Sequence, residues 1–383
     1  MHKNIIYIFL LLAQCLTFAD AYSPPGLQKK WEYLNGYTFF KPIFGKDGTV
    51  YTNSPETDSS EPALYAFTPQ GKLKWALTFP TPKLYEYSRP IIGHDDTVYI
   101  LGLQTLESLA ILRAISPQGK LAWEKKLEGI KPYDQVYLSM RPDHTLLLMK
   151  MRYVEPRRPE STLIALDTNG NNKWQFTLPA ETFYVIGKNS EVYMVCYNTG
   201  LIYHLSTNGQ VKWISSPIPD IKSAAIADDG TFYVLTAHEI YALDQQGHTL
   251  WKNNSIDKYA DHSLKYLSTI NNGRMYVTSY TSLNGNISAV DTSGKEIWRK
   301  TFYQHKLGRI TFDKDIIYIT IKNQWDQVYL AGYDFNGNQV CQSTPAHFVL
   351  SGVTIDREGT IYTGGSEETR GGLRAYLPCS VSN

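Results

Sequence analysis

A phrase of about 45 residues recurs eight times along this chain, and it constrains the fold more than any other feature. Each copy has a turn, a short apolar run that usually ends in Tyr, a second apolar run, and a Gly turn with Trp four residues further on. Repeats of this length are typical of solenoids, propellers and arrays, in which each copy is one supersecondary unit. The turn and first run occur as Gly48–Tyr51, Asp96–Tyr99, His144–Leu147, Ser190–Tyr193, Gly230–Tyr233, Gly273–Tyr276, Asp315–Tyr318 and Gly359–Tyr362.

The Gly turn and its Trp end each copy. The Trp series comprises Trp75, Trp123, Trp174, Trp213, Trp251 and Trp298. The seventh copy has Cys341 instead of Trp, and the eighth ends before it reaches a Gly turn. The missing part stands at the other end of the chain, as Gly26 and Trp31. Because a ring closed by side-chain contact alone would expose strand edges, we expect the N-terminal strand to complete the last blade.

Each copy has the pattern of four short antiparallel strands. In the first copy we expect strands at Pro42–Gly45, around Val50, at Leu64–Phe67 and at Leu73–Trp75. Gly, Asp and Asn occupy the tight turns, whereas Val, Ile, Tyr and Trp fill the strands, and helical periodicity is absent. The repeat therefore predicts an all-β fold, an eight-bladed β-propeller of four-stranded antiparallel blades.

The first 21 residues have the features of a secretory signal peptide. Lys3 precedes an uncharged, mostly apolar stretch at 5–18, and Ala19-Asp20-Ala21 places small residues at the two cleavage positions. The stretch is too short for a comfortable membrane span, and no later stretch is long enough. We expect a leader at residues 1–21, a single propeller domain at 22–383 without a transmembrane segment, and an exported protein, periplasmic or secreted.

The cysteines do not form a metal or scaffold pattern. Gln14 before Cys15 disfavours lipidation of that Cys but leaves it open. Cleavage of the leader leaves Cys196, Cys341 and Cys379, which cannot all pair within one chain. Their spacing has no CxxC and no Cys/His cluster, so we predict no metal-binding residues.

The net charge and the motifs of the sequence exclude some classes of function. The formal charge is +1, from 37 basic and 36 acidic residues, and no basic run is present, so we expect no nucleic-acid partner. Acidic turn residues match no calcium-loop spacing, and the scattered His residues form no catalytic constellation. We predict no catalytic or cofactor-binding residues, although an enzyme is left open because propeller active sites are assembled from distant blades.

At these residues the chain resembles the quinoprotein-like (PQQ-like) β-propeller repeat family, whose blades carry an Ala-x-Asp…Gly-x-x-x-Trp phrase, here Ala165–Asp167 with Gly170 and Trp174. It is similar in size and plan to the eight-bladed propellers of the bacterial outer-membrane β-barrel assembly machinery. The resemblance implies that each Trp of the series, and Trp31, packs between neighbouring blades. Quinone-dependent dehydrogenases of this kind are larger, and many hold the quinone near a disulfide between adjacent cysteines, which this chain lacks. The resemblance therefore implies the fold but not the PQQ cofactor.

Given that packing role, Cys341 lies on the outer strand of the seventh blade and faces the eighth. Cys379 aligns with Gln70, in the turn region of the eighth blade that a Trp at 341 would contact. Two cysteines at one inter-blade contact in an oxidising compartment suggest a disulfide in place of the ring. The alternative is two unrelated cysteines.

One face of the ring is expected to carry connections of varied length, from Asn198–Gly200 to the longer Thr52–Pro62 and Arg152–Ser161. Such variation over a rigid scaffold indicates where binding happens. The connections between blades emerge on the same face and are rich in aromatics. Aligning the copies places one equivalent position just before each first strand, around the channel mouth, at Lys41, Arg89, Tyr137, Phe183, Ser223, Tyr266, Gly308 and Gly352.

Exposed aromatics with a few cations suit a peptide, an unpaired strand or a glycan, and the alternative is that these rings only pack the loops together. The leading interpretation is a monomeric, non-enzymatic, exported module that binds a protein or peptide partner on the loop-rich face, in assembly of envelope proteins. The rival interpretations are a PQQ-dependent oxidoreductase and a secreted propeller that binds or cleaves glycans. We predict no cofactor in the leading interpretation.

Overall fold

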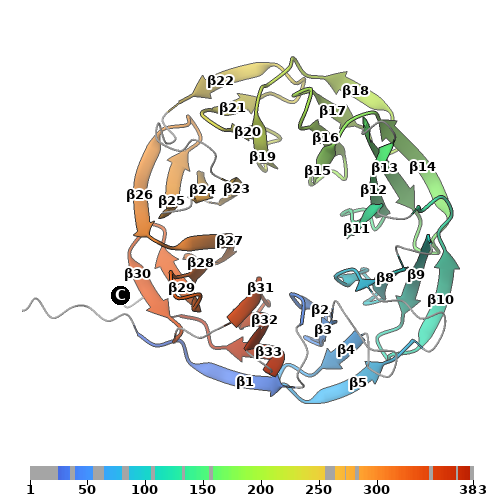
Figure 1. Cartoon of the computed structure of the whole chain (residues 1–383), viewed down its shortest axis with the longest axis vertical. Helices are drawn as coiled ribbons and strands as arrows, with labels where there is room; N and C mark the ends of the chain where they lie inside the picture. Colours follow the sequence, from blue (N-terminus) through green and yellow to red (C-terminus); the bar gives the residue numbers. More distant parts are fainter. Residues whose placement is uncertain are drawn as a thin grey trace, which may run out of the picture.

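The strands form a ring of eight antiparallel blades, and the predicted eight-bladed β-propeller is confirmed (Figure 1). In each blade the first strand lies nearest the centre of the ring and the last lies at the rim. None of the described residues belongs to a helix long and apolar enough to cross a membrane. The computed structural model describes residues 25–34, 39–54, 64–79, 86–104, 108–131, 134–154, 158–254, 264–271, 273–280, 284–344, 348–367 and 370–379.

The first four blades follow the chain in order. Blade 1 comprises β2 (Ile43–Phe44), β3 (Val50–Thr52), β4 (Leu64–Phe67) and β5 (Leu73–Leu77). Blade 2 comprises β6 (Glu86–Tyr87), β7 (Ile91–Ile92), β8 (Val98–Gln104), β9 (Leu109–Ile115) and β10 (Leu121–Lys126). Blade 3 comprises β11 (Gln135–Met140), β12 (Leu146–Val154), β13 (Arg158–Leu166) and β14 (Asn172–Leu178). Blade 4 comprises β15 (Thr182–Ile186), β16 (Val192–Cys196), β17 (Ile202–Leu205) and β18 (Val211–Ile214).

The remaining blades continue around the ring, and the last one takes its outermost strand from the N-terminus. Blade 5 comprises β19 (Ile221–Ile226), β20 (Phe232–Thr236), β21 (Ile240–Leu243) and β22 (Thr249–Asn253). Blade 6 comprises β23 (Leu264–Asn271), β24 (Arg274–Tyr280), β25 (Asn284–Asp291) and β26 (Glu296–Tyr303). Blade 7 comprises β27 (Lys306–Asp313), β28 (Ile316–Lys322), β29 (Val328–Asp334) and β30 (Gln339–Gln342). Blade 8 comprises β31 (Phe348–Ile355), β32 (Ile361–Glu367), β33 (Arg370–Tyr376) and β1 (Lys29–Leu34).

The core lies between successive blades rather than at the centre of the ring. The second strands of the blades contribute its most buried residues, since β16 and β20 are buried at every position. The rim strands alternate, as in β10, where only every second side chain is partly covered. One core cluster joins Tyr193 and Val195 of blade 4 to Phe232 and Val234 of blade 5, so each blade stabilises the next through apolar contact.

Each Trp of the repeat joins its own blade to the next one. The Trp31 ring lies against Gly71 of blade 1, where a Cβ atom would stand 2.5 Å from the ring, and Gly71 has a φ of +83°. Only Gly therefore fits this turn, for both steric and conformational reasons. The Trp31 Nε1–H donates to the Pro69 carbonyl oxygen at 2.9 Å. The equivalent contacts pair Trp75 with Gly119, Trp123 with Gly170, Trp174 with Gly209, Trp213 with Gly247, Trp251 with Gly294 and Trp298 with Gly337.

Between blades 7 and 8 a disulfide takes the place of the ring. Cys341 and Cys379 are bonded, with their Cα atoms 6.0 Å apart. Gly332, directly opposite Cys341, makes room for the bridge, since a Cβ there would lie 2.7 Å from the Cys341 sulfur.

The ring is closed by the N-terminal strand, as the repeat predicted. Strand β1 pairs with β33, so that Trp31 lies opposite Ala375 (Figure 1). The chain just before β1 also reaches blade 7, which the sequence did not indicate. Gly26 forms a parallel bridge with Gln342, and the Leu27 N–H donates to the Gln342 carbonyl at 2.8 Å.

Other expectations need correction. The connection expected at 152–161 is mostly strand, because β12 and β13 pair as far as Val154 and Arg158 and form a long hairpin. The first strand of blade 1 is shorter than Pro42–Gly45, and that of blade 2 is divided into β6 and β7. The predicted leader, with Cys15, lies outside the described residues.

Candidate functional site

The predicted aromatic residues lie at one level of the ring, but within the inner strands rather than before them. The inner strands extend further toward the loop-rich face than the sequence indicated, so only Lys41 and Arg89 precede their strands, β2 and β7. Each aromatic residue pairs with the second-strand residue two positions beyond the Tyr site of the repeat. The pairs are Tyr137 with Met149, Phe183 with Val195, and Tyr266 with Thr278.

The loop-rich face, where the connections between blades and between second and third strands emerge, gathers exposed aromatic side chains. Tyr303 is 74% exposed and Trp325 is 67% exposed. Tyr137, Tyr153 and Tyr197 complete the set of exposed aromatics within the described ranges, and they come from blades 3 and 4 of the same face. A rigid ring that presents five exposed rings on one face offers a contact surface of the kind that protein partners use.

A cavity of about 510 Å³ opens among the inner strands β15, β19, β23 and β27. Phe183, Tyr266 and Arg309 are among the residues that line it. The guanidinium carbon of Arg309 lies 5.3 Å from the centre of the Tyr266 ring, a cation–π contact. Aligning the eight copies of the repeat did not identify Arg309, because the equivalent position in the seventh copy is its neighbour Gly308.

Two further cations lie at the same level. The Arg89 guanidinium carbon stands 5.4 Å from the centre of the Phe40 ring. Burial lowers the pKa of Lys41 to about 8, and the positive charges of Arg89 and Arg309 contribute. Arg309 thus belongs to two groups of residues around the centre of the ring. It lies near the cations Lys41 and Arg89, and it lines the cavity together with Phe183 and Tyr266.

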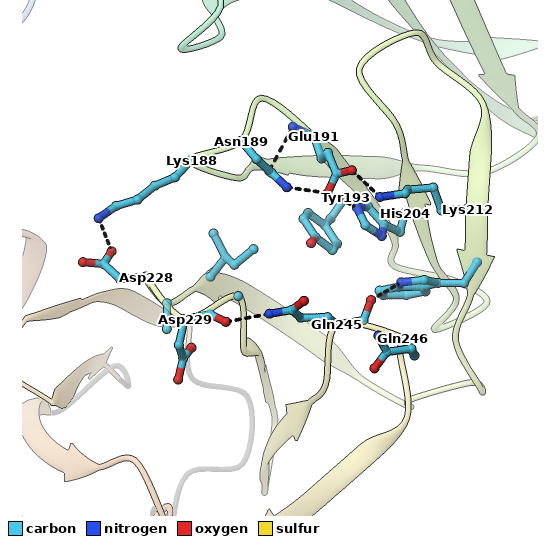
Figure 2. A pocket seen from close by; sticks show the side chains of 14 residues that line it. Lys188, Asn189, Glu191, Tyr193, His204, Lys212, Asp228, Asp229, Gln245 and Gln246 are labelled. Atoms are coloured by element: carbon cyan, nitrogen blue, oxygen red, sulfur yellow. Dashed lines mark hydrogen bonds and ion pairs between the residues drawn. The ribbon is translucent and has the colours of Figure 1, made fainter.

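A second cavity of about 510 Å³ lies on the opposite, short-turn face, between blades 4 and 5 (Figure 2). An ion pair between Lys188 and Asp228, with nitrogen and oxygen 2.6 Å apart, connects the two blades at its edge. His204 and Glu191 form one wall, and Tyr193 lies beside them. No motif in the sequence indicated this cavity.

The wall residues form a hydrogen-bonded chain. The Nε2 of His204 lies 2.9 Å from Glu191 Oε2, and the Lys212 ammonium donates to the other oxygen of Glu191. The His204 ring stacks on the Tyr193 ring, with the ring centres 4.2 Å apart. It meets the Trp213 ring edge-on, with the ring centres 5.1 Å apart. The opposite nitrogen, Nδ1, is buried without a hydrogen-bond partner among the described residues.

Electrostatics favour a neutral imidazole here. Burial lowers the pKa of His204 below its ordinary value of 6.5, although the Glu191 carboxylate opposes this shift. Burial raises the pKa of Glu191, but hydrogen bonds from Lys212, Asn189 and His204 outweigh it and hold the carboxyl below its ordinary value. His204 is therefore neutral at pH 7 and can take up a proton when the pH falls below its pKa.

Comparison with the other blades is the signal that would have identified this wall. The position of Glu191 is Thr in five other blades, at Thr49, Thr97, Thr145, Thr231 and Thr360. The residue opposite Trp, which is His204 in blade 4, is Ala in six, at Ala66, Ala114, Ala165, Ala242, Ala289 and Ala375. Blade 4 differs from the other blades because both positions carry titratable side chains, and these two side chains contact each other. Within the described residues, no group of three His, Cys, Asp or Glu side chains is placed to hold a metal.

A ring of antiparallel blades, seven of which carry on their Gly turn the Trp of the preceding blade, defines a β-propeller of the PQQ-like type. The family model described as outer membrane protein assembly factor BamB matches residues 108–258 and 236–343. The chain therefore belongs to this PQQ-like propeller family. By sequence it matches no curated protein.

Solved structures share the ring at low sequence identity. BamB from Moraxella catarrhalis is similar over 92% of this chain and 99% of its own, with a TM-score of 0.58 and 14% identity. The Dos1 propeller is similar over 92% of this chain and 95% of its own, with a TM-score of 0.61 and 10% identity. The dihydro-heme d1 dehydrogenase NirN is similar over 81% of this chain and 66% of its own, with a TM-score of 0.57 and 11% identity. At these identities the likeness shows the fold alone, which an assembly factor and a dehydrogenase share.

Proposed function

We propose that this protein is a non-enzymatic scaffold that holds a protein partner, through a peptide segment, on its loop-rich face. We further propose that it acts as an exported monomer in the assembly of envelope or outer-membrane proteins, without a quinone cofactor. The observation that carries the proposal is that the exposed aromatic side chains of the described residues all belong to the loop-rich face: Tyr137, Tyr153, Tyr197, Tyr303 and Trp325.

Three further observations support the proposal. Exposed apolar residues elsewhere are mostly single aliphatic side chains spread along the rim strands, such as Leu121, Leu250 and Ile297, which is normal for a protein surface. The description of the matching family is that of an outer membrane protein assembly factor, and the N-terminal sequence has the pattern of a leader.

The test replaces Tyr137, Tyr303 and Trp325 together by Ser, since all three are exposed and their loss should leave the fold intact. A photo-crosslinking amino acid in place of Tyr153 should trap a protein partner in cells that make the parent, and the triple variant should trap at least tenfold less. The matched control replaces Leu121, Leu250 and Ile297 by Ser on the rim. Equal trapping by the folded triple variant would contradict the proposal.

The rival interpretations have direct readouts. Stoichiometric uptake of PQQ in the presence of calcium, followed by absorbance of the purified protein, would contradict the scaffold proposal and favour an oxidoreductase. Selective binding on a carbohydrate array would favour a glycan-binding propeller. We expect neither result.

A further inference from the structure

Three positively charged side chains from different blades converge at the loop-rich end of the central region. Lys41 precedes the inner strand of blade 1, Arg89 precedes the second part of the inner strand of blade 2, and Arg309 lies within β27 of blade 7. Burial is the main cause of the lowered pKa values of Lys41 and Arg89. The three groups are also close enough that Arg89 and Arg309 each lower the pKa of Lys41 further, and Arg309 lowers that of Arg89. Within the described ranges no carboxylate forms an ion pair with any of the three.

The backbone around these cations is specifically shaped. The pairing of β27 with β28 shifts register between Leu307 and Ile310, which places Arg309 at a β-bulge. The pairing of β31 with β32 shifts register in the same way around Gly352. Bulges of this kind re-aim side chains and are common beside functional sites.

Gly352 provides the space that Lys41 occupies. A Cβ atom at residue 352 would stand 2.1 Å from the Cε of Lys41, and the φ of Gly352 is +113°, a conformation that other residues rarely adopt. The Lys41 side chain therefore passes over the bulge of blade 8. Like charges held near one another repel and destabilise the folded protein, and an anion between them would relieve that repulsion.

Aromatic rings adjoin the cations and indicate what kind of anion fits. Arg309 and Arg89 lie against Tyr266 and Phe40, and Tyr266 and Arg309 also act electrostatically on Tyr197. A bare inorganic anion would not use these rings, whereas a peptide can place a carboxylate on the cations and its apolar groups on the rings.

We propose that Lys41, Arg89 and Arg309 form a carboxylate-binding site for an acidic segment of the protein partner. This inference rests on the proposed function, because it names the chemistry of the segment that the loop-rich face holds. The cations fix the acidic group, and the cavity lined by Phe183, Tyr266 and Arg309 accommodates the chain that follows it.

The experiment uses the mature protein and a fluorescent decapeptide that alternates Glu with Leu and Tyr, compared with the same peptide carrying Gln for Glu. The acidic peptide should bind at least tenfold more tightly, and its affinity should fall as NaCl rises because counter-ions screen the cations. The double variant Arg89→Gln/Arg309→Gln and the single variant Lys41→Met should each weaken acidic-peptide binding roughly tenfold, the loss expected for a charge-assisted hydrogen bond. The control Lys120→Gln removes an exposed cation on the opposite face and should change nothing.

Four results would overturn the inference. Equal affinity for the Glu and Gln peptides would exclude carboxylate recognition, and unchanged acidic-peptide affinity in the folded cation variants would place the site elsewhere. Protection against thermal unfolding by inorganic phosphate, without peptide binding, would assign the cations to a free anion. If the cation variants trap the cellular partner like the parent while the aromatic triple variant does not, the carboxylate site fails and the scaffold proposal stands.

Discussion

At the scale of single residues, Glu191 and His204 occupy positions that most other blades fill with Thr and Ala, and the two side chains are hydrogen-bonded to each other. A carboxylate beside the Tyr193 ring would be costly to bury alone, but the Nε2–H of His204 and the ammonium of Lys212 donate to its two oxygens. The pair is therefore expected to behave as one unit in mutational tests, because losing Glu191 leaves the buried Nε2–H of His204 without its partner.

The double variant Glu191→Thr/His204→Ala restores the residues that most other blades use. We expect it to unfold within about 1 kcal/mol of the parent at pH 7, whereas Glu191→Thr alone should cost about 1–3 kcal/mol because the His204 Nε2–H is then unpaired. A double-mutant cycle from urea unfolding measures this coupling. Additive single-residue effects would contradict the interpretation of the pair as one unit.

The same pair predicts a pH dependence. The folded-state pKa of His204 lies below its unfolded value of 6.5, so the unfolded chain binds the proton more readily. Stability contributed by the neutral ring is present above pH 6.5 and is lost as the pH falls through the folded-state pKa. The free energy of unfolding should therefore decrease more steeply between pH 7 and 5 in the parent than in the double variant, and parallel pH profiles would contradict this.

At the scale of strands and blades, the repeated Trp determines how neighbouring elements meet. The Trp174 ring lies on Gly209 of the next blade, and its Nε1–H donates to the Thr207 carbonyl at 2.9 Å. Arg141 donates to the same carbonyl, so both side chains fix the turn of blade 4. One aromatic ring thus supplies both apolar contact and a hydrogen bond between two sheets.

Trp174→Ala should lower the free energy of unfolding by about 3 kcal/mol, the lower end of the range for large-to-small changes, because the ring is partly exposed. Urea unfolding followed by far-UV circular dichroism measures the change. The matched control is Trp325→Ala, which removes a 67% exposed ring and should cost less than about 0.5 kcal/mol. Equal losses in the two variants would contradict the inter-blade role of Trp174.

The architecture could be predicted because the residues that specify it repeat, while the blade-4 cavity depends on residues that do not. Trp174 stands four residues after Gly170, a spacing that recurs in six copies, and the resemblance to the PQQ-like repeat implies that such a ring packs against the next blade. Glu191 and His204 become informative only when the strands bring them together across a ladder, since they are 13 residues apart. Arg309 was missed for a related reason, because the bulge that aims it changes the alignment by a residue.

At the scale of the whole molecule, ten residues at the N-terminus connect three blades. Gly26 pairs with blade 7, strand β1 completes blade 8, and Trp31 contacts blade 1. The disulfide between Cys341 and Cys379 ties blade 7 to blade 8 independently of this strand. Strand β1 and the disulfide therefore hold the ring closed independently of each other, at the place where its ends meet.

Deleting residues 22–34 while keeping the leader should open the ring, because β33 then becomes an unpaired edge. We expect aggregation or a fall of at least several degrees in the thermal midpoint, measured by light scattering and calorimetry. Deleting only residues 22–24 is the control and should leave the midpoint unchanged. A 22–34 deletion that melts like the parent would contradict closure by β1.

The same closure also orders folding in time. Glu32 on β1 meets Arg374 on β33, 342 residues further along the chain. Ribosomes add about 5–20 residues per second, so β1 emerges roughly 20–70 seconds before the strand it must join exists. Until β33 exists, β1 lacks the strand with which it pairs, so the ring cannot close. The first strand to be made is therefore the last to be placed, and any factor that holds it back acts on the final step of folding.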